Sequence, residues 1–184
     1  MEQEFCKWVN LKNPVYIKYH NEEWGVPKYD DKELYELLIL ESFQAGLSWE
    51  CILNKRENFR KAFDNFEIDK IIRYNPQKVE QLRKNEGIIR NRLKIESAIN
   101  NSKIFKQIQK EYGSFSKYIW NFTNNKIIYQ KPEITSSELS DKISEDLKSR
   151  GMKFVGTTII YSYLQAIGVI NSHGKECYLY KKSR

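Results

Sequence analysis

The sequence contains few of the features that mark secreted or membrane-bound proteins. It has three cysteines, an odd number that does not suit a framework of paired disulfides. It has no uncharged apolar run of about 18 residues, the length that a membrane-spanning helix needs. The N-terminus, MEQEFCKW, is neither basic nor apolar enough for a signal peptide. We therefore expect a soluble, cytoplasmic protein with no membrane partner.

The composition instead suits a compact folded chain. Apolar residues make up 40% of the 184 residues and aromatic residues 14%, which excludes a disordered protein and allows a real core. The net charge of +7 suits a polyanionic partner, although a modest basic excess is common among soluble proteins. Composition alone therefore favours nucleic acid without identifying it.

Periodicity and capping residues predict an almost entirely helical chain of roughly eight to ten helices. Ser48 is suited to cap a helix, and Asn75 followed by Pro76 opens another. Strand-like alternation occurs only within residues 124–132, which we interpret as a loop because Asn and Pro flank it. Internal repeats and linkers are absent from the sequence. The predicted fold class is all-α, in one integrated unit over residues 1–184.

One glutamate falls on a helix face that should be buried. In residues 34–49, LYELLILESFQAGLSW, the apolar positions follow the spacing of an amphipathic helix, and Glu41 shares their face. No Lys or Arg lies within one helical turn of it. The residues leave two interpretations open. Glu41 is either a core carboxylate that backbone donors satisfy, or a functional charge that lacks its partner in the free protein.

The histidines and two of the cysteines lie near the chain ends. Cys6 and His20 are close to the N-terminus, and His173 and Cys177 lie in the C-terminal segment HGKEC. Together they make a Cys₂His₂ set, the complement of a closed structural zinc site. The alternative is that the cysteines pack as small apolar residues and the histidines lie on the surface. Cys51, in a predicted helix, is interpreted as a core or half-buried thiol.

A glycine-rich turn between two predicted helices is a second candidate site. The stretch RGMKFVGTTIIYSYLQAIG places a short apolar turn between Gly151 and Gly156, and a helix begins near Thr157. Free N–H groups at a helix start bind anions, and glycine lets a backbone approach a partner closely. Arg150 and Lys153 add positive charge nearby. Such a turn can grip a phosphate, but an ordinary connection between helices has the same residues.

Six motifs together resemble one family. The sequences YHNEEWGVP, LESFQAGLSW, KREN, GIIRNRLKI, KFVGTTI and HGKEC, in this order, closely resemble the 3-methyladenine DNA glycosylase I family. The resemblance runs over residues 6–177 and is weakest in residues 124–137. It implies a helix-hairpin-helix DNA glycosylase fold, with KFVGTTI as the hairpin.

The resemblance also implies a metal. A structural Zn²⁺, one per chain, would tie an N-terminal segment of about residues 1–30 to a C-terminal segment of about residues 169–184. The ligands that it implies are Cys6, His20, His173 and Cys177.

The substrate of the family is an adenine methylated at N3, whose positive charge already weakens the glycosidic bond. By resemblance, Glu41 is the catalytic pocket carboxylate that binds the flipped, cationic base. Trp49 is similar to the residue that stacks on the base, and Tyr19 to a polar aromatic of the same pocket. We expect Tyr16 and Trp8 to wall that pocket. These aromatic residues could instead be ordinary core residues.

Two residues argue against a second activity. Related helix-hairpin-helix glycosylases carry an Asp after the second hairpin helix, and those that cleave strands have a Lys at the start of that helix. In our alignment these positions are Asn171 and Thr158. Asn171 has no charge and Thr158 cannot form a Schiff base. We expect a monofunctional glycosylase without lyase activity.

DNA contacts are predicted from loops and charges. Leu47, on the glycine-containing turn beside Glu41, is either a wedge for the gap left by a flipped nucleotide or a core anchor. Basic residues of the GIIRNRLKI segment either contact phosphates or form a solvated helix face; they are Arg90, Arg92 and Lys94. The predicted backbone grip consists of Gly151, Lys153, Gly156 and Thr157.

Two other kinds of protein remain to be distinguished from a glycosylase. One is a zinc-stabilised helix-hairpin-helix DNA-binding protein without catalysis. The other is a zinc hydrolase, which four protein ligands disfavour because a catalytic zinc keeps a position open. The expected partner is double-stranded DNA that contains alkylated adenine. We expect a monomer in the cytoplasm of a bacterium, associated with the nucleoid while it acts on DNA.

Overall fold

The protein is mostly helical, as the sequence predicts. The computed structural model describes residues 4–180, so the outermost residues of both predicted terminal segments lie outside it. Eleven helices and two short strands occupy the described range. The order is α1 (Pro14–Glu22), α2 (Asp31–Gln44), α3 (Trp49–Asn54), α4 (Arg56–Ala62), a 3₁₀ turn (Asp64–Phe66), α5 (Ile68–Ile71), α6 (Pro76–Arg83), α7 (Arg92–Tyr112), α8 (Phe115–Asn121), β1 (Ile128–Tyr129), α9 (Glu138–Ser149), α10 (Thr157–Ala166) and β2 (Ile170–Asn171).

Polar side chains define where the helices begin and end. Asn75 caps α6 by accepting a hydrogen bond from the Lys78 N–H, and Ser48 caps α3 in the same way. The long helix α7 ends at Gly113, whose φ of 84° is unfavourable for other residues. These caps confirm the helix starts at Ser48 and Asn75 that the sequence predicts.

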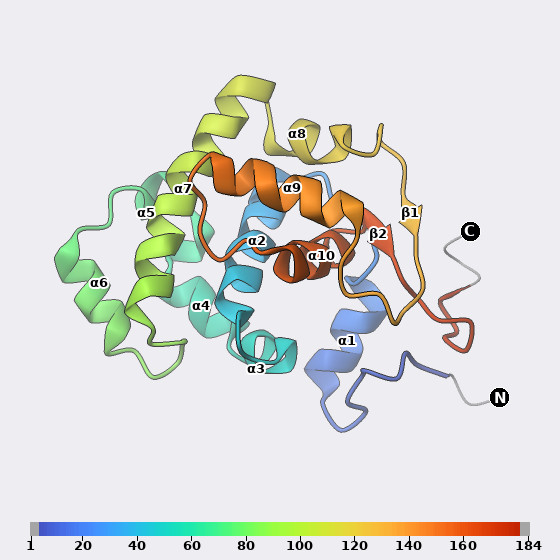
Figure 1. Ribbon diagram of the computed structural model, residues 1–184. Helices are drawn as coiled ribbons and strands as arrows, with labels where there is room; N and C mark the ends of the chain where they lie inside the picture. The colour runs from blue at the N-terminus through green and yellow to red at the C-terminus, as the bar shows by residue number, and fades with distance from the viewer. Residues whose placement is uncertain (1–3, 181–184) are drawn as a thin grey trace.

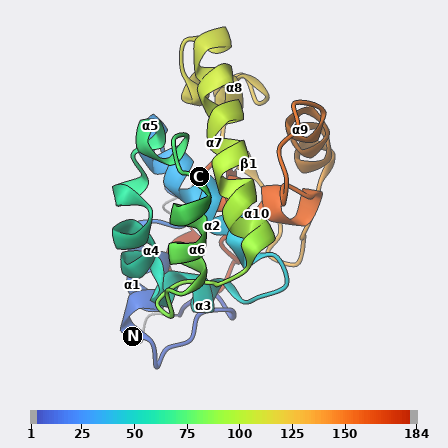
Figure 2. The same cartoon turned by 90° about the vertical axis from the view of Figure 1, so that its left-hand side faces the viewer.

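Two helices form the centre of the molecule. Helix α2 lies against α10 and α7, and α10 also packs against α9 (Figure 1). Viewed from the side, α7 runs upright through the middle of the view, with α4 and α5 on one side of it and α9 on the other (Figure 2). Leu34, Leu37 and Leu38 of α2 are fully buried. The face of α2 that carries Glu41 therefore points into the protein.

The prediction that residues 124–132 form a loop is wrong at Ile128–Tyr129, which form the strand β1. This strand pairs in parallel with β2, with Ile128 opposite Ile170 and Tyr129 opposite Asn171. The Ile128 N–H donates to the Val169 carbonyl at 2.9 Å. The strand-like alternation was therefore a real signal, although the pair is too short to change the helical class. It holds the connection between α8 and α9 beside the C-terminal segment.

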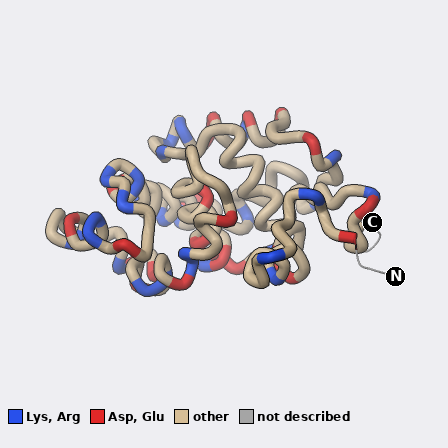
Figure 3. The backbone as a smooth tube through the Cα atoms, turned by 90° about the horizontal axis from the view of Figure 1, so that it is seen from below, with Lys and Arg blue, Asp and Glu red and all other residues tan. Residues whose placement is uncertain are grey.

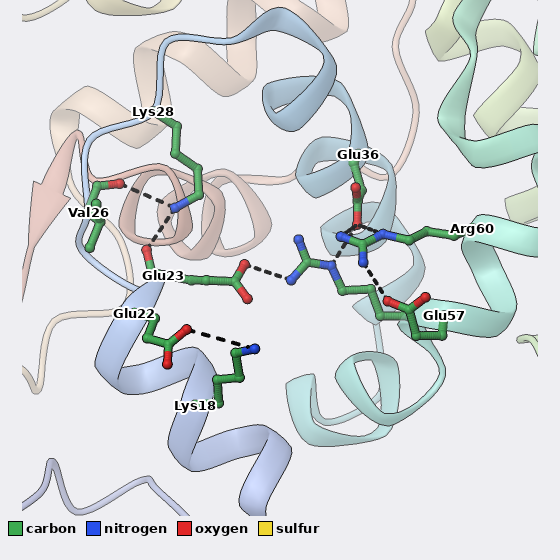
Figure 4. A network of polar contacts seen from close by, with 9 residues as sticks. Lys18, Glu22, Glu23, Val26, Lys28, Glu36, Glu57 and Arg60 are labelled. Atoms are coloured by element: carbon green, nitrogen blue, oxygen red, sulfur yellow. Dashed lines mark hydrogen bonds and ion pairs between the residues drawn. The ribbon is translucent and has the colours of Figure 1, made fainter.

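A network of half-buried ion pairs joins α1, α2 and α4. The Arg56 guanidinium, at the start of α4, donates to Glu23 at 2.7 Å and to Glu36 at 2.6 Å. Glu36 also accepts from Arg60 (Figure 4). Because Glu23 follows α1 and Glu36 lies on α2, the network fixes α1, α2 and α4 relative to one another. Breaking one partner of such a pair leaves a buried charge uncompensated.

Within residues 4–180, no helix combines the length and the apolar character that crossing a membrane requires.

Candidate active site and metal cluster

A cavity of about 280 Å³ opens between α1, α2, α3 and α10. Six aromatic side chains and one carboxylate contribute to its wall. All five pocket residues predicted from the sequence line this single cavity: Trp8, Tyr16, Tyr19, Glu41 and Trp49. A volume of this size matches one small ring system more closely than a large ligand.

Glu41 is a buried carboxyl group without a protein partner. Its side chain is 2% exposed, and its Oε2 atom accepts no hydrogen bond from the described residues. Burial alone raises the pKa of Glu41 well above its ordinary value of 4.5. The sequence left two interpretations open, a core carboxylate satisfied by backbone donors and a functional charge. The absence of backbone donors at Oε2 favours the functional charge. The carboxylate is set up to be completed by a ligand that brings positive charge or N–H donors.

Two tyrosines lie close enough to Glu41 for its charge to raise their pKa. Burial, with smaller contributions from the charges of Glu50 and Glu41, raises the pKa of Tyr16 to about 12. Burial and then Glu41 raise the pKa of Tyr19 well above 10. Both phenols therefore keep their protons at neutral pH. Each can donate or accept a hydrogen bond at the edge of a bound ring.

Two more buried polar atoms of the cavity have no partner among the described residues. They are the Gln44 Oε1 acceptor and the Trp49 Nε1 donor. The Trp49 ring packs on Tyr19, with 5.4 Å between ring centroids. Buried polar atoms without partners are rare in folded proteins, and three in one cavity point to a polar ligand. The cavity therefore offers an aromatic surface together with a carboxylate, a carbonyl acceptor and an N–H donor.

The four residues of the Cys₂His₂ set come together in one buried cluster. Cys6, His20, His173 and Cys177 are all buried, and their ligand atoms lie within 4.8 Å of one another. The Cys177 Sγ lies 3.4 Å from both His20 Nε2 and His173 Nδ1, and the Cys6 Sγ lies 3.5 Å from His173 Nδ1. The alternative that the histidines lie on the surface is wrong. This cluster could hold a metal ion.

Neighbouring groups orient the histidines of the cluster. The His20 Nδ1–H donates to the Asn21 side-chain oxygen at 2.8 Å, which leaves Nε2 as the nitrogen that faces the cluster. Burial lowers the pKa of His173 to about 4, with a further contribution from His20, so its ring is neutral. A neutral imidazole with a fixed tautomer is the form that binds a metal.

Two tryptophans connect the cluster to the cavity. Trp8 and Trp24 both line the cavity. The Trp24 ring packs edge-on against His173 at 4.7 Å between centroids, and the Trp8 ring packs against His20 at 5.4 Å. Two side chains therefore contact the cluster and also form part of the cavity wall.

The turn between α9 and α10 lies at the surface, although the Lys153 N–H and carbonyl are both hydrogen bonded to Asn101. Gly151 and Lys153 are exposed, and Gly156 precedes α10 with no side-chain cap on its first N–H groups. A Cβ atom built on Gly156 would meet nothing within 4 Å, and its φ of −61° is open to any residue. The Thr157 hydroxyl donates to the exposed Asp141 carboxylate. Of the two donor groups of Thr157, the backbone N–H is therefore the one that could bind a phosphate.

Leu47 lies on the exposed turn that follows α2. Its side chain is 42% exposed, so its interpretation as a core anchor is wrong. Gly46, with φ of 77°, allows the tight turn, in which the Leu47 N–H donates to the Gln44 carbonyl at 2.6 Å. An exposed leucine beside the cavity mouth is free to contact a partner.

The three basic residues predicted on residues 90–94 differ from one another. Arg90 pairs with Glu86, and Arg92 pairs with Glu96, both on the surface. Lys94 is only 8% exposed, and its ammonium group donates to the Phe43 carbonyl at 2.8 Å and to the Ala45 carbonyl. Lys94 is therefore neither a phosphate contact nor part of a solvated face. Basic and acidic positions alternate along the chain seen from below (Figure 3), and no single basic face stands out in that view.

Several cavity residues were missed by sequence reasoning. Trp24 stands within the motif YHNEEWGVP, and its position there was the signal that could have identified it. The other missed residues come from the 132–135 loop and from α10, which the fold alone brings to the cavity: Pro132, Ile134, Thr135, Tyr161, Ser162 and Gln165. Thr158 lines the cavity, whereas Asn171 lies on β2 and does not.

The raised pKa of Glu41 predicts a specific pH dependence of stability. Below pH 4.5 the carboxyl group is protonated in both the folded and unfolded chain. As the pH rises above 4.5, the unfolded chain ionises first, so the free energy of unfolding falls until the pH passes the folded pKa. We expect Glu41→Gln to remove this decrease in the free energy of unfolding, because glutamine does not ionise. The decrease should be about 1–3 kcal/mol, the cost of a buried group without a partner. Thermal unfolding of both proteins between pH 4 and 8 checks this. Curves that stay parallel over that range would show that Glu41 is not held in a raised-pKa environment.

A mostly helical fold with an aromatic cavity around a buried carboxyl group has the chemistry of a class of protein that binds planar rings carrying N–H donors or positive charge. Comparison with known proteins identifies the class more closely. The family model for methyladenine glycosylase matches residues 8–180. The chain belongs to the methyladenine glycosylase family, which confirms the family predicted from the six motifs.

Characterised relatives and solved structures agree with this assignment. DNA-3-methyladenine glycosylase 1 of Escherichia coli (strain K12) is 42% identical, over 96% of this chain and 97% of that protein. A crystal structure of 3-methyladenine DNA glycosylase I matches with a TM-score of 0.91 and 40% identity, over 95% of this chain and 98% of that one. A structure of the Staphylococcus aureus enzyme, which concerns its recognition of 3-methyladenine, matches with a TM-score of 0.87 and 39% identity, over 91% and 92% of the two chains.

Proposed function

We propose that the protein is a monofunctional DNA repair glycosylase that releases 3-methyladenine from alkylated double-stranded DNA. The observation that carries the proposal is the partnerless Glu41 carboxylate in an aromatic cavity the size of one ring system. An adenine methylated at N3 is planar and cationic, and its amino group supplies N–H donors. It therefore complements the cavity in shape, charge and hydrogen bonding.

The chemistry needs little from the protein beyond recognition. In the reaction, the bond between C1′ of the sugar and N9 of the base breaks, and both electrons go to the cationic ring, which leaves neutral. The oxygen of a water molecule bonds to C1′ and loses a proton. Glu41 acts by binding the extruded cation, Trp49 by stacking on it, and Tyr19 by hydrogen bonding at its edge, while Tyr16 and Trp8 complete the wall.

The cavity contains no residue suited to strand cleavage among those described. Thr158 lies in the cavity at the start of α10 and cannot form a Schiff base, and no lysine lines this cavity. Asn171 lies outside it. This supports hydrolysis without lyase activity.

The proposed site extends to a helix-hairpin-helix grip on DNA. Helices α9 and α10 pack on each other. The turn between them carries the exposed Gly151 and Lys153 and the half-buried Gly156, and α10 begins with the Thr157 N–H. Leu47 is the wedge that fills the gap left by the flipped nucleotide. Residues 1–184 would act as one unit, as a monomer in the bacterial cytoplasm at the nucleoid.

Zinc fits the Cys₂His₂ cluster. Tetrahedral Zn²⁺, with bonds of about 2.3 Å to sulfur and about 2.0 Å to nitrogen, places neighbouring S and N ligands about 3.5 Å apart. Three of the four S–N distances here are 3.4–3.5 Å, and all the ligand atoms lie within 4.8 Å of one another. Bound zinc would supply a rigid crosslink between the N- and C-terminal segments through Cys6, His20, His173 and Cys177, and four protein ligands keep it from a catalytic role.

Release of the base tests the proposed function. Duplex DNA treated with a methylating agent is incubated with the protein, the free bases are separated and identified by mass, and the strands are run on a denaturing gel. We expect 3-methyladenine in solution and intact strands before alkaline treatment. Binding without release would leave a DNA-binding protein, and strand breaks before alkali would contradict a monofunctional enzyme.

Trp49 should contribute mainly through stacking. We expect Trp49→Leu to weaken binding of free 3-methyladenine about 10- to 100-fold, since base–aromatic stacking is worth about 1–3 kcal/mol. Trp49→Phe, which keeps a ring, should recover most of the affinity. Isothermal titration of the free base measures both. Equal losses in the two variants would show that the indole N–H, and not the stack, carries the contact.

Gly156 tests the backbone grip. The position has neither a positive φ nor a crowded Cβ, so Gly156→Ala should leave the unfolding temperature unchanged. A methyl group between backbone and phosphate should nevertheless weaken binding to undamaged duplex DNA several-fold, about 3- to 10-fold if one phosphate contact is lost. Fluorescence anisotropy at two salt concentrations measures this. Unchanged DNA affinity would remove the turn from the DNA-binding surface.

A further inference from the structure

Helix α7 contacts both of the proposed DNA-contacting elements, although they are far apart in the sequence. Near its start, Lys94 donates two hydrogen bonds to the turn that carries Leu47. Two helical turns later, Asn101 holds the turn between α9 and α10. Its Nδ2 donates to the Lys153 carbonyl at 2.8 Å, and its Oδ1 accepts from the Lys153 N–H at 2.9 Å. The two anchors lie on one face of α7, about 10 Å apart along its axis.

Each anchor is built as a fixed, buried contact. Asn101 is fully buried, and its amide satisfies both backbone groups of Lys153. Lys94 is 8% exposed and satisfies the Phe43 and Ala45 carbonyls at the end of α2. Burying an ammonium group costs free energy unless the group is hydrogen bonded, so the Lys94 side chain is held in one geometry by these two carbonyls. Next to Asn101, Asn100 adds a hydrogen bond to the Gly151 carbonyl at 2.9 Å.

Lys94 also touches the second element directly. Its Nζ lies 5.9 Å from the centroid of the Phe154 ring, within the range of a cation–π contact. Phe154 has a positive φ of 56°, a conformation that a non-glycine residue keeps only where its surroundings impose it. One ammonium group therefore contacts the end of α2 and the apolar tip of the α9–α10 turn at once.

We propose that Lys94 is a positioning residue that sets the Leu47 wedge at a fixed distance from the phosphate-gripping turn, with α7 as the rigid spacer. This proposal rests on the DNA contacts of the proposed function. A wedge acts only if it enters the base stack while the backbone on either side is held, so an error in their separation slows extrusion of the base. The base cavity is not part of the contact, because Lys94 does not line it.

The structure supplies a matched control for Lys94. Lys28 is also 8% exposed and also donates to two backbone carbonyls, those of Glu23 at 2.9 Å and Val26 at 3.4 Å (Figure 4). It lies in the connection between α1 and α2, away from Leu47 and from the α9–α10 turn. Lys28→Met therefore removes the same chemistry without touching the proposed spacing.

The test compares binding of the free base with its release from a duplex. We expect Lys94→Met to bind free 3-methyladenine within about twofold of wild type, and to release it from alkylated duplex DNA about 10- to 100-fold more slowly under single-turnover conditions. Lys94→Arg should recover most of the rate, and Lys28→Met should keep the duplex rate within about twofold of wild type. In a Leu47→Ala background, Lys94→Met should slow release much less than it does alone, since the wedge is already lost.

The outcomes are distinct. Release by Lys94→Met at the wild-type rate would overturn the proposal, as would a parallel loss of free-base affinity, which would place Lys94 in the cavity wall. If Lys94→Met does not fold, Asn100→Ala, a milder change at the other anchor, should still slow duplex release about 2- to 5-fold without affecting free-base affinity. Wild-type rates in Asn100→Ala would then overturn the proposal. Failure of the wild-type protein to release any base would instead refute the proposed function.

Discussion

Glu41→Gln should lower the rate of 3-methyladenine release by about 100- to 1000-fold, the range seen when one preorganised electrostatic group is removed from an active site. The carboxyl group is buried, its Oε2 has no partner among residues 4–180, and the cavity holds it beside two protonated tyrosines. A glutamine keeps the shape and one acceptor oxygen but loses the charge that opposes the cationic base. Single-turnover release from alkylated duplex DNA measures the loss.

A matched glutamate controls for general effects of charge. Glu50 lies near Tyr16 and raises its pKa, but it does not line the cavity, and it accepts hydrogen bonds from Asn10 and Asn13. Glu50→Gln should therefore keep release within about threefold of wild type, as expected for a charge outside the reaction centre. Equal losses in the two variants would mean that the net charge near the cavity matters and that Glu41 has no special role.

Cys177→Ser should remove the metal and lower the unfolding temperature by more than about 8 °C. A ligand present at about a thousand times its dissociation constant stabilises the folded state by about 4 kcal/mol, and each kcal/mol is worth about 2–4 °C for a chain of this size. Wild type should contain one equivalent of zinc by elemental analysis, and the variant less than a tenth as much. Because Trp8 and Trp24 join the cluster to the cavity, binding of the free base should weaken in the variant as well.

The chain again offers a control. Cys51 is a half-buried thiol outside the cluster, as the sequence indicated, and Cys51→Ser should keep both the zinc content and the unfolding temperature near wild type. A wild-type protein that is fully folded with no bound metal would contradict the assignment of the Cys₂His₂ set. Equal loss of stability in both variants would show that loss of a buried thiol, and not of the metal, causes the effect.

The candidate site was predictable to the extent that local chemistry defined it. Glu41 was visible because a carboxylate interrupts an otherwise apolar helix face, and the Cys₂His₂ set because the chain has only two histidines. Family motifs then pointed to Trp49 and Tyr19, and both line the cavity. These residues could be identified from the sequence around them, without knowledge of the fold.

Other parts depend on contacts that no local pattern encodes. Lys94 looks like a surface lysine in the sequence, and its burial follows from two carbonyls at the end of α2 that only the packing of α7 brings near. The residues 132–135 follow β1, which pairs with β2; the alternation around β1 was visible in the sequence, but its partner strand was not. The helices and their caps were therefore predictable, whereas the contacts between distant segments were not.

The central claim is that the bound base supplies the missing hydrogen-bond and charge partner of Glu41. The ionisation of that carboxyl group tests this claim most directly. The carboxyl carbon of Glu41, labelled with ¹³C and assigned by its absence in Glu41→Gln, is titrated by NMR with and without saturating 3-methyladenine. The pKa of Glu41 should lie well above 4.5 in the free protein and fall markedly in the complex, where N–H donors and positive charge stabilise the carboxylate. A pKa that is the same in both states would show that Glu41 is a buried structural residue and not the group that recognises the base.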